Sequence, residues 1–206
     1  MFRLFSTIAS LLFAISWAHS QPASTSAVGP QNLADRTVVH TVFDFTETKK
    51  MTGWIVVNDG VMGGKSKGGF TLKSGHMTFS GVTNTDGGGF SSIRGQLPNG
   101  VDLEKADGFV VRLRTDGKRS FKIDLRQSAP ARTRALSFRA PIRTDANEGW
   151  QEVKVPFSAF KASWRGRAIP SAKLNVAAAT QLGLYIFDGK DGPFRLEVES
   201  VSTYVD

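Results

Sequence analysis

The stretch SFKIDLR, residues 120–126, decides the fold. Its apolar residues Phe121, Ile123 and Leu125 alternate with three charged ones. Successive side chains of a β-strand point to opposite faces, so this alternation predicts a strand with one buried and one solvated face.

The same pattern recurs along the chain from about residue 38, in short runs separated by turn residues, among them many of the 21 glycines. Period-two runs of this kind indicate an antiparallel sandwich or barrel. The helical pieces we expect are few and short, around FSAF and LNVAAATQ. The clearest further runs are GFVVRLR, PFRLEVES, FTLK, GFSSIR, WQEVKV and LGLYIF.

Composition excludes several kinds of site. The chain has 206 residues, 40% of them hydrophobic, which suits one domain with a sizeable core. Cysteine is absent, so disulfides, thiolate metal sites and cysteine nucleophiles are excluded. With only three histidines, a histidine-rich metal site is not expected, whereas a carboxylate–carbonyl calcium site stays open. We predict no cofactor and no metal.

The N-terminal segment reads as a targeting sequence rather than as part of the fold. Residues 1–20 carry a single arginine, an apolar run and small residues before a cut at Gln21, which is typical of a secretory signal peptide. A mitochondrial transit peptide is the alternative, and the run is too short for a membrane span. We expect residues 21–37 to be a flexible leader and 38–206 the domain. The predicted location is secreted or extracytoplasmic, with the mitochondrion as the alternative, and the mature chain has no transmembrane span.

The loop NDGVMGGKS, residues 58–66, carries a lysine and a serine after two glycines, as a phosphate-binding loop does. The first glycine of G-x-x-x-x-G-K-[ST] is missing, because Asp59 occupies its place, and no helix can follow. We therefore predict a glycine-dependent turn in which Met62 is buried in an apolar pocket.

The same loop and several later motifs carry a family resemblance. W-x-x-x-N-D-G-V-M-G-G-K-S (54–66) is followed in order by FSG (79–81), GGGFSSIR (87–94), DGFVVRLRTDG (107–117), WQEVKVPFSAF (150–160) and QLGLYIFDGKDGPFRLEVESV (181–201). This set resembles the complex I intermediate-associated protein 30 (CIA30) family. The resemblance implies an all-β, galactose-binding-domain-like antiparallel β-sandwich, a jelly roll. It also implies a chaperone-like assembly factor for respiratory complex I (NADH:ubiquinone oxidoreductase), not an enzyme.

The polar residues of the two glycine-rich motifs are the first candidates for a ligand or partner site. We expect the two motifs to lie side by side, with Asp59 paired to Arg94. The alternative is that this pairing only holds a loop against a sheet. The candidate residues are Asn58, Asp59, Lys65, Ser66 and Arg94, with the aromatic residues Trp150 and Tyr185.

Catalysis is not predicted, since no nucleophile elbow and no cysteine nucleophile are present. His40 and His76 fall in predicted strands, and the carboxylates Asp188 and Asp191 fall in FDGKDG, which reads first as a turn. We assign no catalytic residue.

Charge indicates the partners. The chain carries 26 Lys and Arg against 18 Asp and Glu, a net charge of +8. Residues 112–143 hold ten basic and two acidic residues, so the net charge of this segment alone equals that of the whole chain. A basic face there would attract an anionic surface such as an acidic glycan, a lipid headgroup or an acidic protein patch, without specific nucleic-acid recognition. An ordinary solvated face is the alternative. The basic-face candidates are Arg112, Arg114, Lys122, Arg126 and Arg134.

Two functions remain open: a protein-interaction or assembly factor, and a secreted carbohydrate- or anionic-ligand-binding module. Aromatic rings exposed on a sheet face would favour the second, because sugars stack on flat rings. Buried rings would favour the first. The rings to inspect are Trp54, Trp150, Trp164 and Tyr185.

Overall fold

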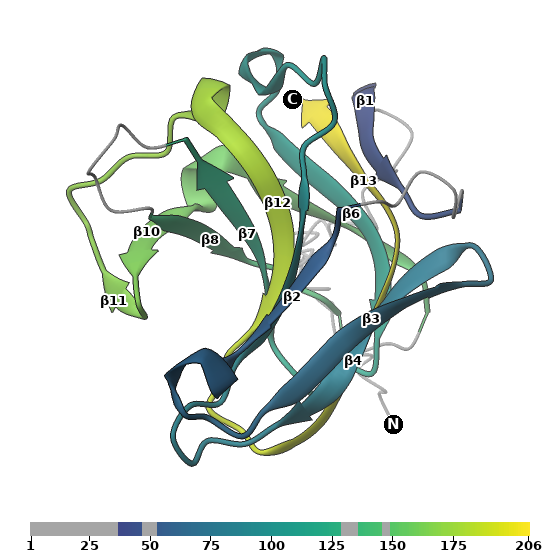
Figure 1. The fold of residues 1–206 in the computed structure, drawn as a ribbon. Helices are drawn as coiled ribbons and strands as arrows, with labels where there is room; N and C mark the ends of the chain where they lie inside the picture. Colours follow the sequence, from purple (N-terminus) through teal and green to yellow (C-terminus); the bar gives the residue numbers. More distant parts are fainter. Residues whose placement is uncertain (1–36, 47–52, 129–135, 146–148) are drawn as a thin grey trace, which may run out of the picture. The chain divides into compact units, whose positions relative to one another are not determined.

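The computed structural model describes residues 37–46, 53–128, 136–145 and 149–206. The predicted signal peptide, nearly all of the leader, and Arg134 lie outside these residues. Within them, the strands pair antiparallel in two sheets, which confirms the sandwich (Figure 1).

The first sheet has six strands in the described residues, in the order β3-β4-β13-β6-β9, with β1 paired to β13. Its strands are β1 (Thr37–Asp44), β3 (Lys67–Lys73), β4 (His76–Thr83), β6 (Gly108–Thr115), β9 (Gln151–Pro156) and β13 (Gly192–Val205).

The second sheet has seven strands in the described residues, in the order β11-β10-β8-β7-β12-β5-β2. Its strands are β2 (Ile55–Asn58), β5 (Ser91–Gln96), β7 (Phe121–Gln127), β8 (Ser137–Pro141), β10 (Lys161–Trp164), β11 (Arg167–Ala168) and β12 (Ala179–Ile186).

The core lies between the sheets and is built by the alternation seen in the sequence. Phe121, Ile123 and Leu125 of β7 are buried, as predicted, and they belong to the same apolar cluster as Phe79 and Phe109 from the first sheet. Aromatic edges pack against one another there: the rings of Phe79 and Phe121 lie 6.3 Å apart at 65°. The opposite face of β7 is therefore free to carry polar side chains.

Helical structure in the described residues is limited to single 3-10 turns, which agrees with the expected few short helices. No helix among the described residues is long and apolar enough to cross a membrane. The turns are η3 (Asp59–Met62), η4 (Leu103–Lys105), η5 (Phe157–Ala159) and η6 (Val176–Ala178).

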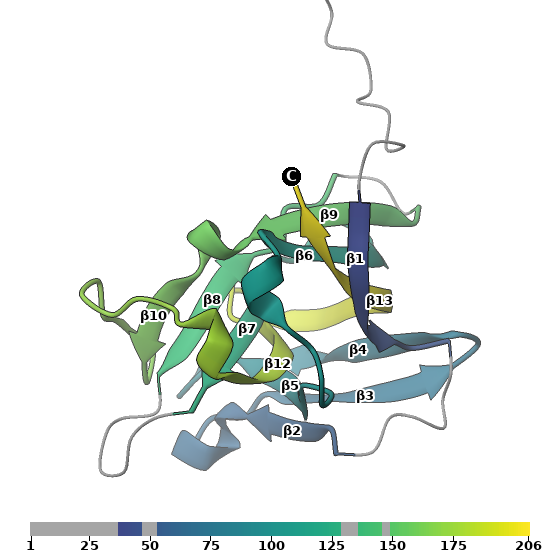
Figure 2. The ribbon, with the colours of Figure 1, turned by 90° about the horizontal axis from the view of Figure 1, so that it is seen from above.

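The longest of the described strands, β13, lies in the first sheet at the C-terminal end of the domain. It pairs with β4 and β6, and its last residues pair with β1, so that Thr37 lies opposite Val205 (Figure 2). The first and last strands of the described domain are thus neighbours.

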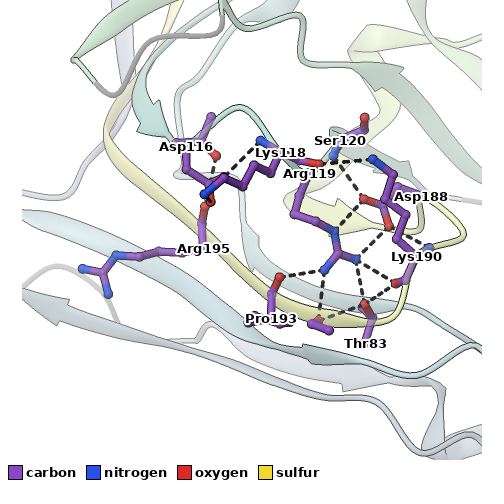
Figure 3. A network of polar contacts seen from close by, with 11 residues as sticks. Thr83, Asp116, Lys118, Arg119, Ser120, Asp188, Lys190, Pro193 and Arg195 are labelled. Atoms are coloured by element: carbon purple, nitrogen blue, oxygen red, sulfur yellow. Dashed lines mark hydrogen bonds and ion pairs between the residues drawn. The ribbon is translucent and has the colours of Figure 1, made fainter.

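A buried arginine ties the turns at one end of the sheets together (Figure 3). The guanidinium of Arg119, in the β6–β7 turn, donates two hydrogen bonds to Asp188 and one to Thr83 Oγ1. It also donates to the backbone carbonyls of Lys190 in the β12–β13 turn and of Gly192 and Pro193 at the start of β13. Asp191 accepts a hydrogen bond from the backbone N–H of Thr85 at 2.7 Å. The two carboxylates of FDGKDG therefore fix turns, as predicted.

Candidate functional site

Asp59 is the centre of the signature loop. Its carboxylate is fully buried and accepts hydrogen bonds from the backbone N–H and the hydroxyl of Ser66, at 2.9 and 2.5 Å. It also accepts from the backbone N–H groups of Gly89 and Phe90, at 2.6 and 3.2 Å. One side chain thus holds two loops together across thirty residues of sequence.

The glycines of the two motifs make room for this carboxylate. A Cβ at Gly64 would lie 2.3 Å from Cγ of Asp59, and one at Gly88 would lie 2.4 Å from its Oδ2. Gly63 has a φ of +88°, where a residue with a Cβ is strained. The loop needs its glycines for close approach and for a left-handed turn, so the prediction of a glycine-dependent turn is confirmed.

The pKa of Asp59 reflects this cradle. Burial raises the pKa, but the hydrogen bonds from Ser66, Gly89 and Phe90 outweigh it, so the pKa falls below its ordinary value. The carboxylate is therefore ionised at neutral pH, which suits an acceptor of four hydrogen bonds.

The expected pairing of Asp59 with Arg94 is wrong. Strand β5 begins next to the Asp59 cradle, and its alternation turns Ser91 and Ile93 inward and Arg94 to the outer face of the sheet. There Arg94 lies close enough to Asp124 for their charges to interact. The two motifs do meet, as predicted, but through backbone N–H groups rather than through an ion pair.

The expected burial of Met62 is also wrong. Asp59 occupies the inward side of turn η3, so the next residues of the turn point outward, leaving Val61 73% and Met62 57% exposed. Lys65 is exposed as well and forms an ion pair with Asp86. The loop is rigid at its base and apolar at its tip.

Asn58 and Ser66 serve the loop itself. The Asn58 amide donates to the carbonyl of Gly68 at 3.1 Å and accepts from the Ser91 hydroxyl at 2.7 Å. The Ser66 hydroxyl accepts from the backbone N–H of Asn84 at 3.0 Å. These candidates hold structure together and leave little capacity for a ligand.

A pocket of about 620 Å³ opens on the outer face of the second sheet. It includes only Arg94 and Tyr185 from the predicted site, together with Arg126 from the predicted basic face. The polar part of its lining is Ser92, Arg94, Arg126, Ser137, Arg139 and Arg165. The apolar part includes Val57, Val61, Met62, Phe90 and Phe187.

The floor of this pocket is a row across four strands. Arg139 of β8 lies opposite Asp124 of β7, which lies opposite Gly183 of β12, which lies opposite Arg94 of β5. A Cβ at Gly183 would lie 2.9 Å from Cβ of Arg94 and 2.3 Å from the carbonyl oxygen of Ile93. Glycine at this position leaves space for the Arg94 side chain on the floor.

Positive charge exceeds negative charge at the floor. Asp124 is buried and forms ion pairs with Arg139, Nε to Oδ1 at 3.0 Å, and with Arg126, Nε to Oδ2 at 3.5 Å. The Nε atoms of Arg94, Arg126 and Arg139 are all buried without a hydrogen-bond partner among the described residues. One carboxylate therefore faces three guanidinium groups.

The pKa values of the floor follow from burial and these charges. Burial raises the pKa of Asp124, while the neighbouring arginines pull it down. Burial, with the like charge of Arg126, lowers the pKa of Arg94. The arginine cluster is thus held at an electrostatic cost that an added anion would relieve.

The four aromatic rings singled out by sequence already face other side chains. Tyr185 stacks on Phe90, with ring centroids 5.7 Å apart, and carries the guanidinium of Arg139 at 3.8 Å from its centroid. Trp164 faces Arg165 at 5.0 Å. Trp54 packs among Phe43, Phe45 and Phe70, and Trp150 lies with Arg112, Arg114 and His76.

The predicted basic face is not one face. Arg112 and Arg114 lie on β6 of the first sheet, where they pair with Glu199 and Glu197, whereas Lys122 and Arg126 lie on β7 of the second. Alternation placed each pair on a common face, but the sequence did not show that the two strands belong to different sheets. Trp150, which lies with Arg112 and Arg114, is therefore not part of the pocket that includes Arg94 and Tyr185.

Among the described residues, no group of three or more His, Cys, Asp or Glu side chains is placed to hold a metal ion. The calcium site left open by the sequence gains no support there.

Comparison with known proteins places this architecture in a family. The model of the family "Complex I intermediate-associated protein 30 (CIA30)" matches residues 43–198. The chain belongs to the complex I intermediate-associated protein 30 family. Both glycine-rich motifs and the pocket floor lie inside the matched range, so the resemblance drawn from the motifs is confirmed.

Curated relatives carry the same name. The chain is 27% identical over 184 residues to "Complex I intermediate-associated protein 30, mitochondrial" of Mus musculus, an alignment covering 80% of this chain and 56% of that protein. It is 33% identical over 99 residues to "Probable complex I intermediate-associated protein 30, mitochondrial" of Caenorhabditis elegans, covering 47% and 29%. The chain thus spans about half the length of the mouse protein and less of the nematode one.

Solved structures agree with the fold. A family 11 carbohydrate-binding module from Clostridium thermocellum, in complex with a mixed-linked tetrasaccharide, gives a TM-score of 0.58 at 17% identity, covering 81% of this chain and 96% of that chain. The solution structure of CtCBM11 gives 0.60 at 17% identity, covering 81% and 94%. The chain therefore shares the β-sandwich fold of these modules.

Sequence reasoning missed Asp124 and Arg139 as site residues. The signal was present in SFKIDLR, where the aspartate falls on the polar face between Lys122 and Arg126. What the sequence lacked was the pairing that brings Arg139 and Arg94 to the same row.

Proposed function

We propose that this chain is a non-catalytic binding factor that acts on partner proteins during the assembly of a complex. The observation that carries the proposal is the exposed apolar pair Val61–Met62, displayed on a loop whose base is locked by Asp59. Exposed large apolar side chains on a fixed scaffold are typical of protein-interaction sites.

The surroundings of the pair support a docking surface. Ile55 and Val56 of β2 and Phe187 after β12 are also large apolar residues exposed to solvent. Val61, Met62 and Phe187 line the same pocket. Val61, Met62 and Phe187 therefore gather beside the loop, as the apolar centre of an interface requires.

The aromatic criterion set by the sequence is met by one ring of the four. Tyr185 is buried, whereas Trp54, Trp150 and Trp164 are half-buried, and each of the four packs against another side chain. The carboxylates considered for catalysis serve turns instead, Asp188 through Arg119 and Asp191 through Thr85.

We propose, from the names of the relatives, that the partners are intermediates of respiratory complex I. Binding to complex I intermediates requires that this protein is located in mitochondria, whereas its predicted signal peptide indicates export. Sequencing the N-terminus of the mature protein from fractionated cells decides between these addresses. A mature protein found outside mitochondria would contradict the complex I partner and leave the docking function to be tested on exported proteins.

The docking function is tested with the full chain in its own cells. Val61→Ser with Met62→Ser should abolish co-migration with complex I intermediates on native gels, because the apolar contact is lost. Val82→Ser is the matched control, since Val82 is 51% exposed on β4 of the first sheet. Unchanged co-migration of the double variant would overturn the proposal.

A further inference from the structure

We propose that the pocket on the outer face of the second sheet binds an acidic side chain of the partner, presented next to apolar residues in an extended segment. The inference rests on the proposed docking function and names what the partner presents. Its carboxylate would lie over Arg94, Arg126 and Arg139, and its apolar neighbours over Val61, Met62 and Phe187.

The charge of the floor selects an anion. Arg94, Arg126 and Arg139 surround a single buried carboxylate, Asp124, and Arg165 adds a fourth guanidinium at the rim. Each arginine carries a planar fork of donors that matches a carboxylate in bidentate fashion. A bound carboxylate would offset the excess positive charge at the place where the sheet holds it.

Arg94 is the arginine of the floor that is most available to an added anion. The Nε atoms of Arg94, Arg126 and Arg139 are all buried without a hydrogen-bond partner among the described residues. Arg126 and Arg139 each form an ion pair with Asp124, at 3.5 and 3.0 Å, so Arg94 is the least compensated of the three. Leaving a buried charged donor without an acceptor costs free energy, so these donors indicate that a bound ligand supplies the acceptor.

The walls select a protein segment over an acidic sugar. The rings of Tyr185 and Trp164 are faced by arginines, which leaves Phe187 as the exposed aromatic ring of the lining, next to Val61 and Met62. Side chains of Val61 and Met62 instead offer flexible apolar contact directly beside the charged floor. A pocket of about 620 Å³ accommodates a few side chains of such a segment.

The test uses the full chain as bait for a displayed library of random decapeptides. We expect selected peptides to carry Asp or Glu beside one or two large apolar residues. Arg94→Gln should weaken binding of a selected peptide by about tenfold or more, since a charge-assisted pair is lost. Arg143→Gln is the control, because Arg143 is exposed, lies outside the pocket and carries the same charge.

A second readout separates recognition from a structural role. Arg94→Gln should leave the Tm unchanged or raise it, because it removes a buried donor without a partner and repulsions with Arg126 and Arg139 that outweigh the attraction to Asp124. A lowered Tm would show that Arg94 serves the fold and would overturn the proposal.

The other outcomes are also decisive. Selection of apolar peptides without acidic residues, with affinity insensitive to Arg94→Gln, would overturn the acidic-segment proposal and leave the docking function intact. Failure to select any peptide would overturn it too, while co-migration tests the docking function separately. Calorimetric binding of tri-galacturonate that depends on Arg94, without peptide binding, would reassign the pocket to acidic sugars.

Discussion

Arg119 and Asp188 are joined by two hydrogen bonds of 2.8 Å, Nε to Oδ2 and Nη2 to Oδ1, with both side chains buried. The same guanidinium donates to Thr83 Oγ1 at 2.7 Å and to the carbonyl oxygens of Gly192 and Pro193. This pair fixes the β6–β7 turn against the β12–β13 turn.

We predict that Asp188→Asn lowers the free energy of unfolding by about 3–5 kcal/mol, because it leaves Arg119 buried without its countercharge. Urea unfolding followed by tryptophan fluorescence measures the loss. Lys65→Met is the control, since the ion pair of Lys65 with Asp86 is exposed and should contribute at most about 1 kcal/mol. Equal effects of the two substitutions would refute this account.

The Asp59 cradle predicts which glycines are indispensable. Gly64→Ala and Gly88→Ala should each destabilise the domain by about 1–3 kcal/mol, because the new methyl group would overlap the Asp59 carboxylate. Gly60→Ala is the control in the same loop, where a Cβ would meet nothing within 4 Å. Thermal unfolding should rank the three, and a Gly60 variant as unstable as the others would contradict the cradle.

Exposure of Met62 predicts a tolerant position. Met62→Ala should change the free energy of unfolding by less than about 0.5 kcal/mol, whereas Phe79→Ala in the core should cost about 3–5 kcal/mol. A loss of several kcal/mol at Met62 would restore the buried position expected from sequence.

Acid should weaken the domain through Asp59 and Asp188, whose pKa values are both lowered in the folded state. A lowered pKa contributes stability above the unfolded value, and that stability is lost as the pH falls through the folded value. We expect the Tm to fall progressively below about pH 5. Asp59→Asn should flatten this dependence while lowering the Tm at pH 7, and an unchanged slope would count against the assignment.

Retention on an anionic column tests where the basic charge acts. Lys122→Gln with Arg126→Gln should lower the eluting salt concentration more than Arg112→Gln with Arg114→Gln. Both of the latter arginines already pair, with Glu199 and Glu197, whereas of the former two Arg126 pairs with Asp124 and Lys122 lies on the polar face of β7. Retention should fade with salt, because exposed charges are screened over about 8 Å at physiological ionic strength. Equal shifts for the two pairs would indicate dispersed charge.

The sequence sufficed where one local rule decides the outcome. Alternation in β7 predicted which face of Phe121, Ile123 and Leu125 is buried, and the glycines of the 58–66 loop predicted a turn. The motifs also predicted the family, because two specific glycine-rich patterns occur in order.

It did not suffice where two distant segments decide the outcome. Whether Met62 points inward depends on Asp59, which finds two of its donors about thirty residues away at Gly89 and Phe90. The arginine cluster depends on the strand order β8-β7-β12-β5, which a single sequence does not specify. Both errors therefore concern tertiary pairing rather than local conformation.

The pairing of β1 with β13 makes the domain suited to circular permutation. Because Thr37 and Val205 are opposite residues of one antiparallel ladder, a short glycine-rich linker can join them without crossing the sandwich. New ends could then be opened at the exposed Asn99–Gly100 turn, far in sequence from the 58–66 loop. The permuted protein would present the Val61–Met62 tip and the arginine floor on the same scaffold. Its new N-terminus could carry any chosen targeting sequence, so that binding and targeting could be varied separately.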